Sequence, residues 1–240
     1  MTSPYDALAP YYDEVVRGRR DDAKVLRQVL KKYRCRPKTV LDLACGSGKL
    51  TKEFKNAKVT GIDLSPGMLT LAREQLPEAT LLQADMRSLR LPGRFDAAWC
   101  MYDSMNHLAN FRDWTRTMQT AHRHLNPGGV FVFDVNTVTK LEAMVADSPF
   151  MHHFKKGMLV TEVSKQKSRY LWQLNIFERQ KDDLYRLQEA EIPETAYETE
   201  RILEVMERTF EDVTILDPVR KRPSKHSLRL YFAGRRAKMK

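Results

Sequence analysis

Residues 40–51 read VLDLACGSGKLT, an apolar run followed by a turn with glycines at positions 46 and 48. The apolar residues predict a buried strand, and the glycines allow the backbone to come close to a ligand. Ligands of open α/β sheets bind at the carboxyl ends of the strands, so we expect a ligand at residues 44–48. The residues around this turn decide which ligand fits.

The chain up to about residue 150 alternates between expected strands and expected helices. Ser65 and Pro66 suit a helix start, because a hydroxyl caps the first turn and proline fits it. The helix that runs to His124 is expected to end at a turn, NPGG at 126–129. Strands are expected at 39–45, 58–64, 79–85, 95–101 and 129–135, and helices at 25–33, at about 48–56, from residue 65 and at 111–124. Strands that are apolar on both faces and separated by helices predict a doubly wound, mostly parallel sheet.

The chain after residue 150 has a different pattern. Alternating stretches at 157–165, 168–180 and 182–192 predict three antiparallel strands, a β elaboration in the C-terminal third. A helix at about 197–209 and strands at 212–217 and 227–234 complete a seven-stranded, Rossmann-like α/β sheet. We expect one domain, 1–240, divided into a helical lid at 1–37, a core at 38–150, a β insertion at 151–195, and a final helix, strands and basic tail at 196–240.

The charge of the chain is unevenly distributed. The formal net charge is +10, and basic residues gather in segments 17–38 and 220–240 around an acidic remainder. We interpret these segments as a solvated helix face and tail rather than as a nucleic-acid surface. Cys35, Cys45 and Cys100 are scattered, the first residues lack a secretory pattern, and no apolar run has the length of a membrane span. These features predict a cytoplasmic protein.

The turn at 44–48 matches neither of two common phosphate-binding loops. A phosphate loop needs Ser or Thr after its lysine, whereas Lys49 is followed by Leu50. The dinucleotide fingerprint lacks its third glycine, because Thr51 stands at that position. Asp42 argues further against phosphate, since a carboxylate at the end of the strand repels a pyrophosphate and attracts a cation.

Two more acids follow the next two expected strands. Asp63 comes about 20 residues after Asp42, the spacing at which an acid accepts hydrogen bonds from a ribose diol. Asp85 ends the third strand, where it would accept a hydrogen bond from the amino group of adenine. S-adenosylmethionine offers a partner to each of the three acids, because it has a cationic amino-acid end, a ribose and an adenine.

Five motifs follow one another in an order that resembles class I S-adenosylmethionine-dependent methyltransferases. They are DLACGSG (42–48), GIDLSPGML (61–69), ADMRSL (84–89), FDAAWCMYDSMNHL (95–108) and LNPGGVFVFDVN (125–136). The resemblance covers roughly residues 38–136. It is greatest to small-molecule enzymes of this class, and the chain is also similar to amino-sugar N-methyltransferases. Ala44 stands where the family often has glycine, and ERTFEDV at 207–213 replaces the usual Ala-Gly-Phe.

The resemblance implies cofactor contacts from the turn, from the ends of the next strands and from the lid. These residues are Asp42, Ala44, Cys45, Gly46 and Gly48 around the methionine part, Asp63 on the ribose, Leu64, Met68, Asp85 and Met86 around the adenine, and Met101 and Tyr11 elsewhere on the cofactor. Tyr5, Tyr11 and Tyr12 are expected to be lid residues that close on cofactor and substrate, with hydrophobic docking of that segment as the alternative.

The segment 100–108 is expected to lie over the transferred methyl group. His107 is the candidate general base, because an imidazole titrates near neutral pH; simple packing is the alternative role. Asp103 is expected either to orient a cationic substrate or to cap a turn. Trp172 and Phe177 are candidate walls of the acceptor pocket if they face inward. The other histidines lack metal-ligand spacing, so no metal site is expected (His122, His124, His152, His153).

These observations predict an enzyme that transfers a methyl group to an N, O or C atom of a small molecule by in-line displacement. It would act away from membranes, as a monomer or homodimer. A methyltransferase of RNA or protein that uses the basic segments is one alternative. The sequence MYDS at 101–104, in place of Asn/Asp-Pro-Pro-Tyr, argues against methylation of exocyclic base amines. A cofactor-binding module without chemistry is the other alternative.

Overall fold

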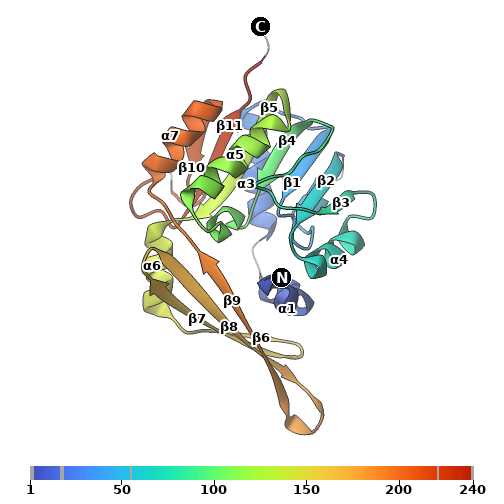
Figure 1. The fold of residues 1–240 in the computed structure, drawn as a ribbon, viewed down its shortest axis with the longest axis vertical. Helices are drawn as coiled ribbons and strands as arrows, with labels where there is room; N and C mark the ends of the chain where they lie inside the picture. Colours follow the sequence, from blue (N-terminus) through green and yellow to red (C-terminus); the bar gives the residue numbers. More distant parts are fainter. Residues whose placement is uncertain (1–2, 17–18, 55, 221, 239–240) are drawn as a thin grey trace.

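The computed structural model describes residues 3–16, 19–54, 56–220 and 222–238. It contains two sheets, a seven-stranded one above and a four-stranded one that hangs below it in Figure 1. The larger sheet has the order β10-β11-β5-β4-β1-β2-β3. Its strands are β1 (Thr39–Leu43), β2 (Lys58–Asp63), β3 (Thr80–Gln83), β4 (Phe95–Cys100), β5 (Leu125–Asn136), β10 (Glu211–Leu216) and β11 (Arg229–Arg235). Only β11 runs antiparallel to its neighbours β5 and β10, so the expected doubly wound, mostly parallel seven-stranded fold is confirmed.

Helices cover both faces of this sheet. On one face Trp114 and Met118 of α5 pack with Met206 of α7 against the sheet, and on the other Leu26 and Val29 of α3 pack on it. The helices are α3 (Arg19–Lys32), α4 (Pro66–Gln75), α5 (Phe111–Arg123), α6 (Val138–Asp147) and α7 (Thr199–Thr209). Fully buried apolar strands between two helical layers are what the continuous apolar runs predicted.

Helix α4 begins as expected from its sequence. The Ser65 side chain accepts a hydrogen bond from the backbone N–H of Met68 at 3.0 Å, and Pro66 is the first helical residue. This cap directs α4 away from the carboxyl end of β2, where Asp63 lies.

Two local expectations about the core are wrong. The helix expected at about 48–56 is only a 3-10 turn, η2 (Thr51–Glu53), because the backbone of Phe54 leaves the helical region, with a φ of −110° and a ψ of 51°. The Thr51 hydroxyl is bonded to buried Asp42 and accepts from Trp99 Nε1. The NPGG segment is not a separate turn but the first part of β5. There the Gly128 N–H donates to the Arg236 carbonyl, and the Arg236 N–H donates to the Gly129 carbonyl.

The smaller sheet has four antiparallel strands where three were expected. They are β6 (Phe150–Phe154), β7 (Gly157–Gln166), β8 (Arg169–Arg179) and β9 (Tyr185–Glu194). The additional strand β6 contains His152 and His153, both exposed. The β8–β9 hairpin extends away from the core at the bottom of Figure 1.

The N-terminal segment packs between the two sheets. It consists of α1 (Pro4–Leu8), η1 (Ala9–Tyr11) and α2 (Tyr12–Val15), and its apolar side joins a cluster with the inner face of the smaller sheet (Leu8, Tyr11, Leu174, Ile176, Ile192). Asp6 fastens it to α4 by accepting from the Ser65 hydroxyl at 2.5 Å and from the Gly67 N–H at 3.1 Å. Asp13 fastens it to the glycine turn through Lys49, 2.9 Å away.

Several cations of the basic tail are bonded within the fold. Arg229 faces Asp134 and Asp22, and Arg235 donates to the Tyr33 and Gly128 carbonyls. Arg236 donates to three carbonyls at the end of α5 (His122, Arg123, Leu125). The two basic segments, 17–38 and 220–240, were expected to be solvated. Residues 17, 18, 221, 239 and 240 of these segments lie outside the described residues. Within the described part of the chain, every helix is too short or too polar to cross a lipid bilayer.

Candidate functional site

A cavity of about 290 Å³ opens at the carboxyl ends of β1, β2 and β4. The N-terminal segment and the end of β9 form the wall opposite these strands. The lining residues are Ser3, Pro4, Tyr5, Tyr12, Ala44, Cys45, Gly46, Ser47, Lys49, Leu50, Asp63, Leu64, Met68, Ala84, Met86, Met101, Tyr102, Ser104, His107, Ile192 and Pro193. Nine of the fourteen predicted site residues are among them (Ala44, Cys45, Gly46, Asp63, Leu64, Met68, Met86, Met101, His107).

The glycine turn and Asp63 are joined by backbone hydrogen bonds. One carboxylate oxygen of Asp63 accepts from the Gly46 N–H at 2.8 Å, and the other accepts from the Ser65 N–H at 2.9 Å. Burial raises the pKa of Asp63, although these hydrogen bonds and nearby His107 oppose the change. Ala44 and Gly46 both have positive φ, of 65° and 54°, which turns the backbone around the cavity. Ala44 therefore adopts a conformation that glycine takes more easily.

Apolar side chains form the wall beyond Asp63. Leu64 is 57% exposed at the mouth of the cavity, an unusual place for a large apolar side chain. Met68 from α4 and Met86 lie deeper and are buried. Together these residues form a surface against which a flat apolar ring can pack.

Asp42 and Gly48 lie behind the turn, outside the cavity lining. The Asp42 carboxylate is buried and bonded to Thr51, and burial raises its pKa to about 7. Gly48 has a φ of 77°, and a Cβ there would come within 2.8 Å of the side chain of Leu76, the residue that follows α4. Both residues support the shape of the turn from the inside of the protein.

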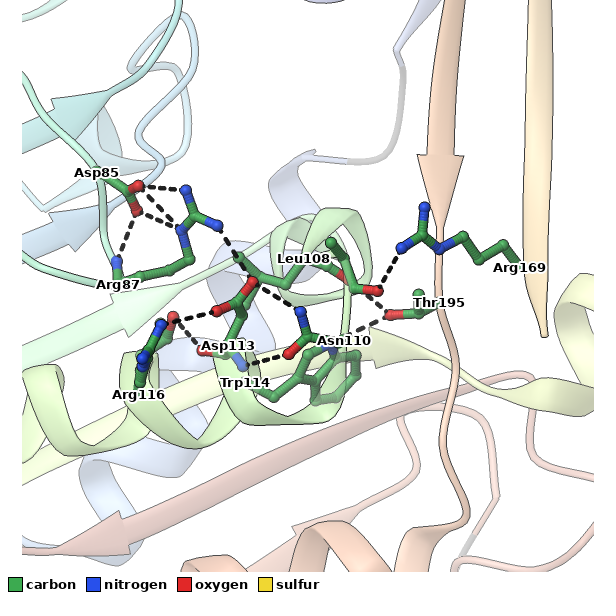
Figure 2. A network of polar contacts seen from close by, with 11 residues as sticks. Asp85, Arg87, Leu108, Asn110, Asp113, Trp114, Arg116, Arg169 and Thr195 are labelled. Carbon is green, nitrogen blue, oxygen red and sulfur yellow. Dashed lines mark hydrogen bonds and ion pairs between the residues drawn. The ribbon is translucent and has the colours of Figure 1, made fainter.

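Asp85 also lies outside the lining, because Arg87 binds its carboxylate. Arg87 Nη2 is 2.6 Å from one oxygen of Asp85, and Arg87 Nε is 3.0 Å from the other. Burial raises the pKa of Asp85, but the hydrogen bonds from Arg87 outweigh it and the net change is downward. Arg87 also forms an ion pair with Asp113 at the start of α5, as Figure 2 shows. Asp113 in turn is capped by Asn110, whose side chain accepts from its N–H.

The lid contributes different tyrosines from the one assigned to the cofactor. Tyr11 points into the smaller sheet, where its ring lies 4.5 Å from that of Phe154. Tyr5 and Tyr12 line the cavity instead. Trp172 belongs to the cluster under the N-terminal segment but not to the cavity lining. Phe177 follows buried Ile176 and so lies on the opposite face of β8; the expectation that it walls the pocket is wrong.

His107 ends a 3-10 turn, η3 (Ser104–His107), after β4. Its Nε2 is 2.8 Å from the Tyr5 hydroxyl and 4.0 Å from a carboxylate oxygen of Asp103. Burial lowers the pKa of His107, with Asp103 and Asp63 opposing the change. The imidazole is therefore neutral near neutral pH, and a neutral imidazole can accept a proton.

Glu194 at the end of β9 is a site residue that the sequence analysis missed. One atom from each of Asp103, His107 and Glu194 lies within 4.8 Å of the others. Glu194 is buried, and Asn136 donates to its carboxylate at 3.3 Å. Burial and Asp103 raise the pKa of Glu194 well above its usual range. The alternation of β9 could have identified it in the sequence. Glu194 lies on the same inner face of β9 as Ile192, and an acid at an inward position is unusual.

The core is similar to known proteins. Residues 40–129 match the model of a methyltransferase domain. A Streptomyces venezuelae protein, dTDP-3-amino-3,4,6-trideoxy-alpha-D-glucopyranose N,N-dimethyltransferase, is 36% identical over 134 residues, 52% of this chain and 56% of that protein. A Streptomyces fradiae protein, dTDP-3-amino-3,6-dideoxy-alpha-D-glucopyranose N,N-dimethyltransferase, is 32% identical over 133 residues, 53% of this chain and 52% of that protein. The chain spans about half the length of these relatives.

Solved structures resemble the whole chain. An S-adenosylmethionine-dependent methyltransferase from Clostridium acetobutylicum superposes with a TM-score of 0.83 at 23% identity, covering 99% of this chain and 100% of that one. The sugar N-methyltransferase KedS8 from a Streptoalloteichus species has a TM-score of 0.80 at 21% identity, covering 99% and 94%. At these identities the likeness shows the fold, and the two sheets of this chain are arranged as in these enzymes.

Proposed function

We propose that this chain, whose residues 40–129 belong to a methyltransferase domain family, is an S-adenosylmethionine-dependent methyltransferase of a small-molecule amine. The observation that carries the proposal is the shared cavity. The turn that binds Asp63 lies on one wall, and His107 lies on the other, beside Asp103 and Glu194. A cofactor and a basic acceptor can thus be held next to each other.

The residues present fit S-adenosylmethionine. Each oxygen of Asp63 already accepts one backbone N–H, which orients the carboxylate and leaves a lone pair on each for a ribose hydroxyl. Leu64, exposed at the cavity mouth, and Met68 would pack on the adenine. Ala44, Cys45, Gly46 and Met101 would surround the methionine part. Asp42 and Gly48 would support this binding through the turn, without contact.

The acceptor assignment rests on charge. Asp103 and Glu194 flank His107. Burial and Asp103 favour the neutral form of Glu194, and an ammonium ion placed between the two carboxyl groups would favour its charged form. Two relatives are named as N,N-dimethyltransferases of amino sugars, which agrees with an amine acceptor. A metal ion held by the same three groups is the competing use of this cluster, and we propose that the reaction proceeds without one.

The chemistry assigned to the chain is proton removal and alignment. S-adenosylmethionine supplies an electrophilic methyl group on a sulfonium. His107 would take the proton from the acceptor ammonium, so that the amine nitrogen gains the lone pair that attacks. Asp103 would stabilise the imidazolium that results. Tyr5 and Tyr12 would close the cavity and hold the acceptor in line, since orientation contributes a large part of such rate enhancements.

The test uses the purified chain with radiolabelled S-adenosylmethionine. Nucleotide-linked amino sugars and simple amino sugars are offered first, then total RNA and an undigested protein extract. Label in the amino-sugar product supports the proposal, and it should persist with EDTA present. Label in RNA or protein alone, or loss of activity with EDTA that Mg²⁺ or Zn²⁺ restores, would contradict it. Binding of S-adenosylhomocysteine without transfer to any acceptor would leave a binding module.

A further inference from the structure

The loop that carries Asp103 and His107 has a costly backbone conformation. Tyr102 and Asp103 are consecutive residues with positive φ, 60° and 50°. Neither is glycine, and residues with a Cβ avoid this region unless surrounding contacts hold them there. The 3-10 turn η3 starts immediately afterwards, so these two backbones set the direction in which His107 enters the cavity.

One ion pair contacts both of these residues. A carboxylate oxygen of Asp134, on β5, accepts from the Asp103 N–H at 3.0 Å and from Arg229 Nε, on β11, at 2.7 Å. The Arg229 guanidinium lies over the Tyr102 ring, 5.6 Å from its centroid. Asp134 thus holds the backbone of Asp103 while Arg229 holds the side chain of Tyr102.

This pair is buried in a place where stability alone does not explain it. Asp134 is 0% exposed, and one of its oxygens and one Arg229 nitrogen have no hydrogen-bond partner in the described structure. Burying an ion pair costs desolvation that the attraction repays only with good geometry. Asp22 on α3 is a second acid at Arg229, 3.4 Å from Nη1, but it does not reach the loop.

We propose that Asp134 and Arg229 are positioning residues for the methyl transfer, a role that rests on the proposed function. They fix Tyr102 and Asp103 in the left-handed conformation, and through η3 they set the position of His107 relative to the acceptor. Arg229 belongs to the basic C-terminal segment, so one cation of that segment serves the active site rather than an external partner.

The test compares Asp134→Asn and Arg229→Lys with the control Asp22→Asn, which removes the other acid at Arg229. For the first two variants kcat should fall by about 10- to 100-fold, the range for a slightly misplaced catalytic group. S-adenosylhomocysteine affinity should be unchanged. Asp22→Asn should lower the melting temperature but not kcat. Equal losses of kcat in Asp22→Asn and Asp134→Asn would overturn the proposal, because general destabilisation would explain both.

A second measurement does not depend on turnover. The imidazole resonances of the isotopically labelled protein are assigned with His107→Asn, and the His107 signal is followed in each variant. It should move in Asp134→Asn and Arg229→Lys and stay in Asp22→Asn. If it moves while the wild type methylates no acceptor, Asp134 and Arg229 still fix the position of His107, and it is the proposed methyl transfer that fails. A signal unchanged in both loop variants would reject the positioning role whatever the activity.

Discussion

The Tyr5 hydroxyl lies 2.8 Å from Nε2 of His107, joining the N-terminal segment to the loop after β4 across 102 positions of sequence. The Tyr5 ring also meets the imidazole edge-on, with centroids 5.5 Å apart. Burial raises the pKa of Tyr5 well above its usual range, so it stays a neutral hydrogen-bonding group. The N-terminal lid and the candidate base are therefore linked directly through Tyr5.

Replacement of His107 should affect turnover far more than cofactor binding. We expect His107→Asn to lower kcat by about 100-fold, the lower range for loss of a general base. Tyr5→Phe should lower it by roughly tenfold, the value of one hydrogen bond of about 1.4 kcal/mol. His152→Asn, on exposed β6, is the control. Unchanged rates would reduce His107 to a packing residue.

The pH dependence of turnover follows from the lowered pKa of His107. The folded state favours the neutral imidazole, so an acid limb in kcat should lie below about pH 6.5, the ordinary value for histidine. Stability has the same sign: the unfolded chain binds the proton more readily there, and the fold loses stability as pH falls through this range. A pH series on wild type and His107→Asn checks both effects. An acid limb that persists in the variant would belong to another group.

Asp63 and Asp85 should differ in their effect on the cofactor. Asp63→Ala removes the carboxylate that lines the cavity, and loss of about 2 kcal/mol of hydrogen bonding would weaken S-adenosylhomocysteine binding by about 30-fold. Asp85→Asn changes a carboxylate already bound by Arg87 and should cost less. Calorimetric titration of both variants decides. A larger loss for Asp85→Asn would mean that Arg87 releases this acid to the adenine.

Arg236 should stabilise the fold although it belongs to the basic tail. Its guanidinium donates to the His122, Arg123 and Leu125 carbonyls, the shortest at 2.6 Å. We expect Arg236→Ala to lower the free energy of unfolding by about 1–2 kcal/mol, as for charged hydrogen bonds. Lys238→Ala removes a neighbouring exposed charge and should change nothing. Denaturant unfolding of both variants measures the difference, and equal stabilities would show that these bonds contribute little.

Patterns confined to neighbouring residues were sufficient for most of the core. Ser65 and Pro66 gave the start of α4 because an N-cap depends only on residues within one turn. Asp63, the last residue of β2, lines the cavity because parallel strands end at one edge of the sheet. The helix expected at about 48–56 was wrong because the chain leaves helical geometry at Phe54, which no local capping residue signals.

The residues that the sequence placed poorly depend on contacts from distant segments. Asp85 forms an ion pair with Arg87, and Arg87 is held in place by a second ion pair with Asp113 on α5. Tyr11 and Tyr12 are adjacent, and only the packing of the segment on β6 decides which enters the cavity. Glu194 lies near His107 although the two are 87 positions apart in the sequence. The end of β9 is held against η3, because the Thr195 N–H donates to the Asn106 carbonyl and the Thr195 hydroxyl donates to the Leu108 carbonyl. Trp114 Nε1 also donates a hydrogen bond to the Thr195 hydroxyl (Figure 2).

The end of β9 lines the cavity, and β9 belongs to the four-stranded sheet, whose strands pair with none of the seven-stranded sheet among the described residues. Ile192 and Pro193, which line the cavity, can consequently be replaced without altering the strand that carries Asp63. We therefore expect substitutions at the end of this one hairpin to change the preferred acceptor while cofactor binding is retained. A mutant library restricted to these positions is accordingly the economical route to altered selectivity in this scaffold.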